Sequence, residues 1–180
     1  MHALPAAYLL NMLILLTSAD SALSIRRTFL RIRPFTEADR PFLRTLFLAA
    51  RKASWTWLDP DGWQLEDFDH VVLGEQVLVA EEEGHRLGFA AWLENDNFLH
   101  SLFIDPHYQG HGVGSALLQA VQERFTGTGA LKCLSENKHA LQFYLQHGWK
   151  EVSEGESEHG RYILMHYPKA TQVRYAGRES

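Results

Sequence analysis

Hydrophobic and polar positions alternate over residues 30–35, Leu-Arg-Ile-Arg-Pro-Phe, which predicts a half-buried β-strand. Pro34 has no backbone N–H to donate, so we expect this strand at a sheet edge or the proline at a strand end. Thr-Glu-Ala-Asp begins at Thr36 and is typical of a capping box, the start of a helix. Apolar residues then recur at helical spacing, which predicts a helix to about Ser54.

The middle of the chain predicts a shorter helix and three consecutive strands. An Asp-Pro-Asp-Gly turn precedes the helix, which we expect over residues 63–73. Turn sequences then separate three apolar stretches, which predict strands over residues 76–81, 87–93 and 98–105. The first two strands flank Glu-Glu-Gly-His and are expected to form a hairpin.

The second half of the chain alternates helices with strands. Residues 112–125 have apolar positions on one helical face, and residues 137–147 form the last predicted helix. Gly148 lies where a helix end commonly needs a left-handed residue. Residues 130–134, between the two helices, are short and apolar, which indicates a buried strand.

A final strand pair is predicted at residues 149–153 and 161–166, joined by a loop rich in Glu, Gly and Ser. The complete order β-α-α-β-β-β-α-β-α-β-β predicts a mixed α/β (α+β) fold with one sheet. We expect one domain over residues 25–168, followed by a polar tail over residues 169–180.

The first 24 residues are expected to lie outside this fold. Residues 3–16 carry no charge, but this stretch is shorter than the roughly 20 residues that span a bilayer as a helix, so we expect no stable membrane span. Residues 17–19, Thr-Ser-Ala, fit a signal-peptide cleavage site, although no Lys or Arg precedes the apolar run. A start-site artefact, a signal or anchor, and a docked helix all stay open.

Composition excludes several classes of protein. The 180 residues, 46% hydrophobic and 22% charged, fit a single globular domain and neither a disordered nor a fibrous chain. The single cysteine, Cys133, rules out an internal disulfide framework, and the ten histidines form no metal-binding motif, so we expect no metal. The net charge of −5 disfavours a nucleic-acid partner.

The segment from Phe98 to Leu118 carries the clearest candidate chemistry. A predicted strand leads into a turn with glycines at 110, 112 and 114, and the turn opens a helix. Glycine lets the backbone approach an anion closely, and the N–H groups of a helix start carry partial positive charge. The pattern predicts a phosphate-binding turn, the alternative being only a tight connection from strand to helix. It lacks the glycine spacing of dinucleotide sites and the Walker lysine.

At this turn, Gln-Gly-His-Gly-Val-Gly over residues 109–114 resembles the Arg/Gln-x-x-Gly-x-Gly/Ala signature of the GNAT acetyltransferase superfamily. A second signature runs from Asn137 to Tyr144, followed by Gly-Trp at 148–149, at the family spacing. The resemblance covers about residues 28–167 and is closest to the small bacterial YjaB-like group. It implies the GNAT acyl-CoA N-acyltransferase fold and transfer of an acetyl group from acetyl-CoA to a primary amine.

The resemblance also implies the roles of individual residues. Backbone N–H groups of the turn would hold the pyrophosphate of acetyl-CoA, and the preceding strand would pair with its pantetheine arm. Asn137 would contact the cofactor, and Tyr144 would protonate the leaving thiolate, the alternative being a tyrosine that only packs its ring. The expected cofactor-binding residues are Leu102, Phe103, Ile104, Gln109, Gly110, His111, Gly112, Val113, Gly114, Ser115 and Asn137.

A general base is sought elsewhere, because Lys132 occupies the position where some members of the family have Glu. His100, on the strand that leads to the turn, is our first candidate. We expect it on the same face as Leu102 and Ile104. A sheet histidine with satisfied hydrogen bonds is the alternative, and a water chain could replace a side-chain base.

Three further features have two interpretations each. Cys133 is either a nucleophile of a two-step reaction or a small buried hydrophobe. The tryptophans near the connection of the first two helices either line an acceptor pocket or pack together, and the nearby acids either attract an ammonium group or form a solvated face. These residues are Trp55, Trp57, Trp63, Glu66, Asp67 and Asp69.

Two functions are left: an N-acetyltransferase, or a non-catalytic acyl-CoA-binding regulatory module of the same fold. Tyr144 favours the enzyme, because a binding module needs no phenol at the leaving thiol. The acceptor stays open among small amines, antibiotics, peptides and lysine side chains, and so does a homodimer through the final strand pair. The cofactor predicts a cytoplasmic location.

Overall fold

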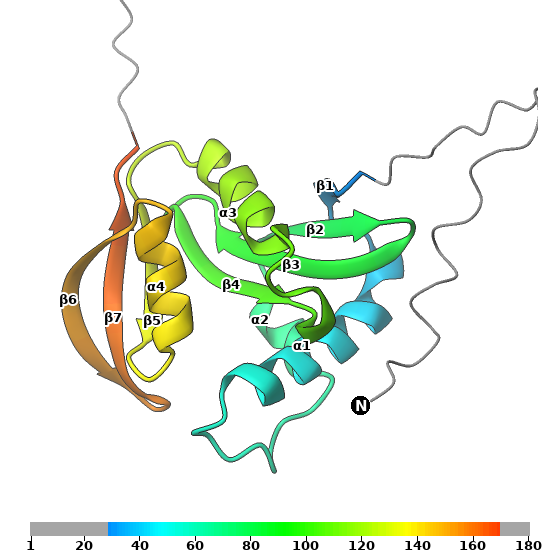
Figure 1. Cartoon of the computed structure of the whole chain (residues 1–180), viewed down its shortest axis with the longest axis horizontal. Helices are drawn as coiled ribbons and strands as arrows, with labels where there is room; N and C mark the ends of the chain where they lie inside the picture. Colours follow the sequence, from blue (N-terminus) through cyan, green and yellow to red (C-terminus); the bar gives the residue numbers. More distant parts are fainter. Residues whose placement is uncertain (1–28, 170–180) are drawn as a thin grey trace, which may run out of the picture.

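The computed structural model describes residues 29–169 (Figure 1). The expectations for residues 1–24, and for the tail after Lys169, lie outside the described residues. The elements are β1 (Arg31–Pro34), η2 (Glu37–Asp39), α1 (Arg40–Ser54), α2 (Asp67–Val71), β2 (Gln76–Glu82), β3 (His85–Leu93), β4 (Phe98–Ile104), η3 (Pro106–Tyr108), α3 (Val113–Arg124), β5 (Gly129–Leu134), α4 (Lys138–Gln146), β6 (Lys150–Ser157) and β7 (Gly160–Tyr167).

The predicted order of helices and strands is confirmed, with two 3-10 turns added. Within the described residues, seven strands form one sheet in the order β1-β2-β3-β4-β5-β7-β6. Neighbouring strands are antiparallel except β4 and β5, which are parallel. β1 is an edge strand, as Pro34 predicts. An edge strand has a neighbour on one side only, so the missing N–H of a proline costs no hydrogen bond to a second neighbour.

Two predicted elements have the wrong length. α2 begins only at Asp67, because the Asp67 carboxylate accepts a bond of 2.9 Å from the Gln64 N–H and fixes a turn there. The loop expected after residue 153 is mostly strand, since β6 continues to Ser157 and pairs with β7. β6 is the outermost strand and almost wholly exposed, so polar residues are tolerated on both of its faces.

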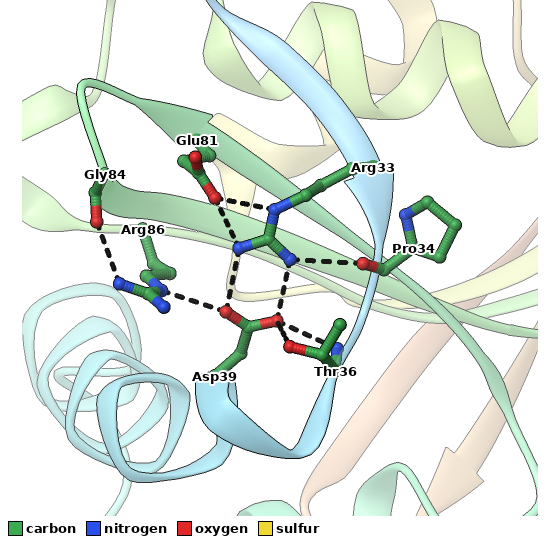
Figure 2. A network of polar contacts seen from close by, with 7 residues as sticks. All are labelled: Arg33, Pro34, Thr36, Asp39, Glu81, Gly84 and Arg86. Carbon is green, nitrogen blue, oxygen red and sulfur yellow. Dashed lines mark hydrogen bonds and ion pairs between the residues drawn. The ribbon is translucent and has the colours of Figure 1, made fainter.

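The capping box predicted at Thr36 is confirmed. The Asp39 carboxylate accepts from the Thr36 N–H at 2.9 Å, and the short turn η2 leads into α1, which has Pro41 in its first turn. The same carboxylate accepts hydrogen bonds from Arg33 of β1 and Arg86 of β3 (Figure 2). This network joins the start of α1 to two strands of the sheet.

Two apolar cores lie on opposite faces of the sheet. α3 and α4 contribute Leu117, Val121 and Leu141 to the first, which also contains Trp149. α1 and α2 contribute to the second, in which Phe68 and Phe89 are fully buried. Figure 1 shows the result: β1–β4 form one part of the sheet, and β5, β7 and β6 turn away from it at the other end, beside α4.

Candidate active site

The parallel strands β4 and β5 separate soon after they meet. They pair at only two positions, Phe98 with Ala130 and Leu99 with Leu131. β4 continues to Ile104 with β3 on its other side, so the β5-facing edge of residues 100–104 has no strand beside it. Figure 1 shows this divergence between β4 and β5. An open strand edge of this kind can pair with the backbone-like arm of an extended ligand.

An irregularity in β4 contributes to the separation. Ala91 pairs with Ser101 while the next residue of β3, Trp92, pairs with Leu99, so His100 is an extra residue, as in a β-bulge. Bulges bend a strand and redirect its side chains. Leu99 consequently packs in the same core as Leu102. In a regular strand, two residues three positions apart would point to opposite faces of the sheet.

His100 therefore does not share a face with Leu102 and Ile104, and that prediction is wrong. Its Nδ1 lies 2.5 Å from Oε1 of Glu75, a residue that follows α2 on the opposite side of the sheet. The His100 side chain is 41% exposed and the Glu75 side chain only 6%. Sequence reasoning missed Glu75, because nothing in its local pattern marks it.

The glycine turn ends beside the open edge of β4. Gly110 and Gly112 have φ of 77° and 81°, values that favour glycine, and α3 begins at the next residue. The first main-chain bond of α3 runs from the Ala116 N–H to the Gly112 carbonyl oxygen at 3.0 Å. The N–H groups before Ala116 are thus the free donors of the helix start, which can bind an anion.

A cleft of about 530 Å³ occupies the space between the diverging strands, within the usual size range of ligand pockets. It brings together most of the predicted side chains, with Trp55 and Cys133 beside them. The predicted residues that line it are His100, Leu102, Phe103, Ile104, Gln109, Gly114, Asn137 and Tyr144. The predicted residues outside its lining are Gly110, His111, Gly112, Val113 and Ser115.

The predicted residues outside the lining can contribute main-chain N–H groups to a ligand more readily than they can contribute side chains. The Val113 side chain is buried in the core. The Ser115 Oγ lies 2.9 Å from Nε2 of His147, whose Nδ1 lies 2.7 Å from the Phe143 carbonyl oxygen. Because a carbonyl can only accept, Nδ1 donates to it. Sequence reasoning missed this contact of His147.

Asn137 has a structural contact as well as a place in the cleft. Its Oδ1 accepts a bond of 3.2 Å from the Ala140 N–H, so the side chain caps α4. The amide nitrogen is the part of the side chain left to face a ligand.

Two titratable groups of the cleft are held in their neutral forms. Burial raises the pKa of the Tyr144 phenol above its usual value, and Cys133 adds to the shift. Burial also raises the pKa of the Cys133 thiol, to about 12. Near neutral pH, the Tyr144 phenol is therefore protonated and Cys133 is not a thiolate.

The tryptophans and acids near α2 have separate roles. Trp55 lines the cleft and packs edge-on against Phe103 and Trp63, with ring centroids 5.8 and 6.0 Å apart. Trp57 and Trp63 are not in the lining. Asp67 and Asp69 accept hydrogen bonds from arginines, so their charges serve the packing of α1 and α2. One tryptophan therefore forms part of the cleft wall.

This splayed sheet, with the free N–H groups of the glycine turn at its opening, is typical of the acyl-CoA N-acyltransferase class of fold. Residues 74–151 match the sequence model of the acetyltransferase (GNAT) domain. The match includes β4, the glycine turn and β5, but not the cleft residues contributed by α1.

Individual proteins are similar to this chain. Peptidyl-lysine N-acetyltransferase YiaC of Escherichia coli (strain K12) is 35% identical over 84 residues, 47% of this chain and 56% of that protein. The chain thus spans little more than half the length of this relative. The solution structure of apo-form YjaB from Escherichia coli has a TM-score of 0.65 at 19% identity, covering 79% of this chain and 99% of that chain.

The crystal structure of PaiA N-acetyltransferase from Thermoplasma acidophilum in complex with coenzyme A also has a TM-score of 0.65, at 16% identity. It covers 78% of this chain and 99% of that chain. At these identities the structural likeness establishes the fold. Within residues 29–169, no helix has the length and apolar character to cross a membrane, and no three His, Cys, Asp or Glu side chains group as metal ligands.

Proposed function

We propose that this protein is an acetyl-CoA-dependent N-acetyltransferase that transfers the acetyl group to a primary amine by direct attack. The observation that carries the proposal is the separation of β4 from β5 beside the free N–H groups at the start of α3. Free donors suit a diphosphate, and the open strand edge suits the amide-containing pantetheine arm that connects the diphosphate to the thioester.

Each part of the cofactor has proposed partners. Main-chain N–H groups of residues 110–115 bind the diphosphate, since Gln109 is uncharged and the Ser115 hydroxyl already contacts His147. The strand residues 102–104 hold the pantetheine arm, and Asn137 contacts it through its amide nitrogen. A main-chain N–H near Ile104 stabilises the oxyanion that develops on the thioester carbonyl.

The proton transfers have proposed partners too. The amine nitrogen bonds to the thioester carbon and gives up a proton to His100, directly or through water. The carbon–sulfur bond breaks, and the thiolate takes the phenolic proton of Tyr144, which solvent then restores. Acetyl-CoA supplies the activated acyl group for this sequence. The neutral state of Tyr144 in the cleft supports its role as the donor.

The finer aspects of the function are also proposals. Acetyl-CoA as co-substrate supports a cytoplasmic location, and the net charge of −5 supports a protein without a nucleic-acid partner. The exposed edge of β6 supports a homodimer through sheet extension. We propose a domain over residues 25–168, with residues 1–24 outside it.

An acetyl-transfer assay tests the proposal directly. We expect thiol release from acetyl-CoA in the presence of an amine, and isothermal titration should give a measurable heat with coenzyme A. The acceptor panel includes a lysine-containing peptide, because one relative is named a peptidyl-lysine N-acetyltransferase, together with free amino acids, polyamines and aminoglycosides. Coenzyme A binding without transfer to any amine would favour the acyl-CoA-binding module, and absence of binding would reject both.

We expect Tyr144→Phe to lower kcat by roughly 100-fold, the lower end of general-acid contributions, because thiolates leave readily. The ring contacts with Trp149 and Phe143 are retained in the variant, so the fold should not change. Steady-state kinetics measure kcat, and titration of coenzyme A checks that binding is unaffected. Unchanged turnover in Tyr144→Phe would reject this residue as the proton donor.

We expect Cys133→Ala to keep kcat within about threefold of the wild type. The thiol is buried, and its raised pKa of about 12 leaves it protonated, so it cannot accept an acetyl group as a thiolate. Initial rates at several concentrations of both substrates should give intersecting lines, as expected for direct attack. Parallel lines, or loss of turnover in a folded Cys133→Ala protein, would indicate an acetyl-cysteine intermediate.

A further inference from the structure

The carboxylate behind His100 is an unusual feature of the cleft. Glu75 lies between α2 and β2, and its side chain is 6% exposed. Its Oε1 lies 2.5 Å from Nδ1 of His100, whereas its Oε2 is buried without a hydrogen-bond partner. A buried carboxylate with an unsatisfied oxygen costs free energy, so a merely structural contact with a partly exposed histidine explains it poorly.

The contact with Glu75 determines which nitrogen of the His100 ring is left free to act as a base. A carboxylate accepts hydrogen bonds, so Nδ1 carries the proton that it donates to Glu75. In the neutral ring, Nε2 then carries the lone pair and can take a proton. His100 lines the cleft, whereas Glu75 is not in its lining, so only the imidazole can reach a substrate or its water.

Apart from Glu75, the described titratable groups near His100 provide no negative charge that could stabilise its imidazolium form. Lys132 of β5 lines the same space, with its Nζ 4.6 Å from the centre of the Tyr162 ring. Its ammonium opposes a second positive charge on His100. The remaining titratable groups of the lining are Cys133, His139, Tyr144 and His159, and none of them is a carboxylate. Glu75 is the one described carboxylate in contact with His100 that can stabilise its imidazolium form.

We infer that Glu75 is a positioning residue for the reaction, which holds His100 with Nε2 toward the cleft and stabilises the imidazolium formed when the amine loses its proton. The inference rests on the proposed function. The proton moves from the amine nitrogen to Nε2, while the proton on Nδ1 stays in the bond to Glu75. The ring later returns its extra proton to solvent. The β-bulge is what places His100 within reach of this carboxylate.

Two variants separate charge from orientation. Glu75→Gln keeps an acceptor for Nδ1 but loses the charge, so we expect the acid limb of the kcat/KM profile to move to lower pH by roughly one unit. Glu75→Leu loses the acceptor as well, and we expect kcat to fall about 10- to 100-fold with the KM for acetyl-CoA unchanged. Glu94→Gln, an exposed residue between β3 and β4 outside the cleft lining, is the matched control and should change neither quantity.

A measurement on the resting protein separates this inference from the proposed function. Long-range ¹H–¹⁵N spectra of ¹⁵N-histidine-labelled protein report the tautomer, and the His100→Gln spectrum assigns the signals. We expect the Nδ1–H tautomer at high pH in the wild type and a mixture in Glu75→Leu. If the wild type is active and Glu75→Gln has the same pH profile, the inference is overturned. It is also overturned if His100 of the wild type has the Nε2–H tautomer. If the wild type has the expected tautomer but transfers no acetyl group, only the proposed function is overturned.

Discussion

Gly112→Asp is expected to weaken coenzyme A binding by about 1,000-fold. A Cβ atom added at this position meets no atom within 4 Å, so an aspartate can be placed there beside the free N–H groups of α3. Placing it against a diphosphate costs several kcal/mol of like-charge repulsion, and each 1.4 kcal/mol is tenfold in affinity. Isothermal titration with coenzyme A measures the loss.

Two matched variants separate this effect from backbone strain. Gly84 in the β2–β3 hairpin has φ of 80°, close to the 81° of Gly112, and is similarly open. Gly84→Asp should therefore lose stability and keep affinity. Gly112→Asn has the size of the aspartate without its charge, and asparagine tolerates a positive φ. We expect it to bind at least tenfold more tightly than Gly112→Asp. Equal affinity of Gly112→Asp and wild type would mean that the diphosphate binds elsewhere.

Local signals in the sequence predicted most of the fold. Pro34 predicted an edge strand because a proline removes a ladder donor, and Gly148 predicted a helix end, where its φ is indeed 85°. β6 was predicted too short because its length is set by pairing with β7. That pairing links distant residues, such as Glu154 with Ile163, and polar composition alone indicates a loop.

The site was predictable where it depends on the main chain and less so where it depends on contacts between distant residues. Glycines at 110 and 112 marked the turn before α3, since a positive φ restricts the residue type. The bulge at His100 has no signature within β4, because it arises from the register with Trp92 of β3. Glu75 is 25 residues from His100, so the pair becomes visible only in the folded chain.

Asp39→Ala is expected to cause the largest loss of stability, lowering the free energy of unfolding by about 3–5 kcal/mol. Asp39 is completely buried, and its carboxylate accepts from Arg33 at 2.7 and 2.8 Å and from Arg86 at 2.9 Å (Figure 2). Its removal leaves Arg33 with Glu81 and the Pro34 carbonyl oxygen as hydrogen-bond partners, and Arg86 with the Gly84 carbonyl oxygen. Urea unfolding followed by circular dichroism measures the change.

The pH dependence gives this prediction a sign. The hydrogen bonds from Arg33 hold the pKa of the Asp39 carboxyl well below its usual value, against the opposing effect of burial. The carboxylate therefore stabilises the fold fully above the unfolded pKa of about 4, and this contribution is lost as the pH falls further. The difference in stability between wild type and Asp39→Asn should shrink below about pH 4.

Glu37→Gln, in the same turn but exposed and bonded to Arg40, is the control and should unfold like the wild type. If Asp39→Asn also unfolds like the wild type at neutral pH, the network in Figure 2 does not stabilise the fold.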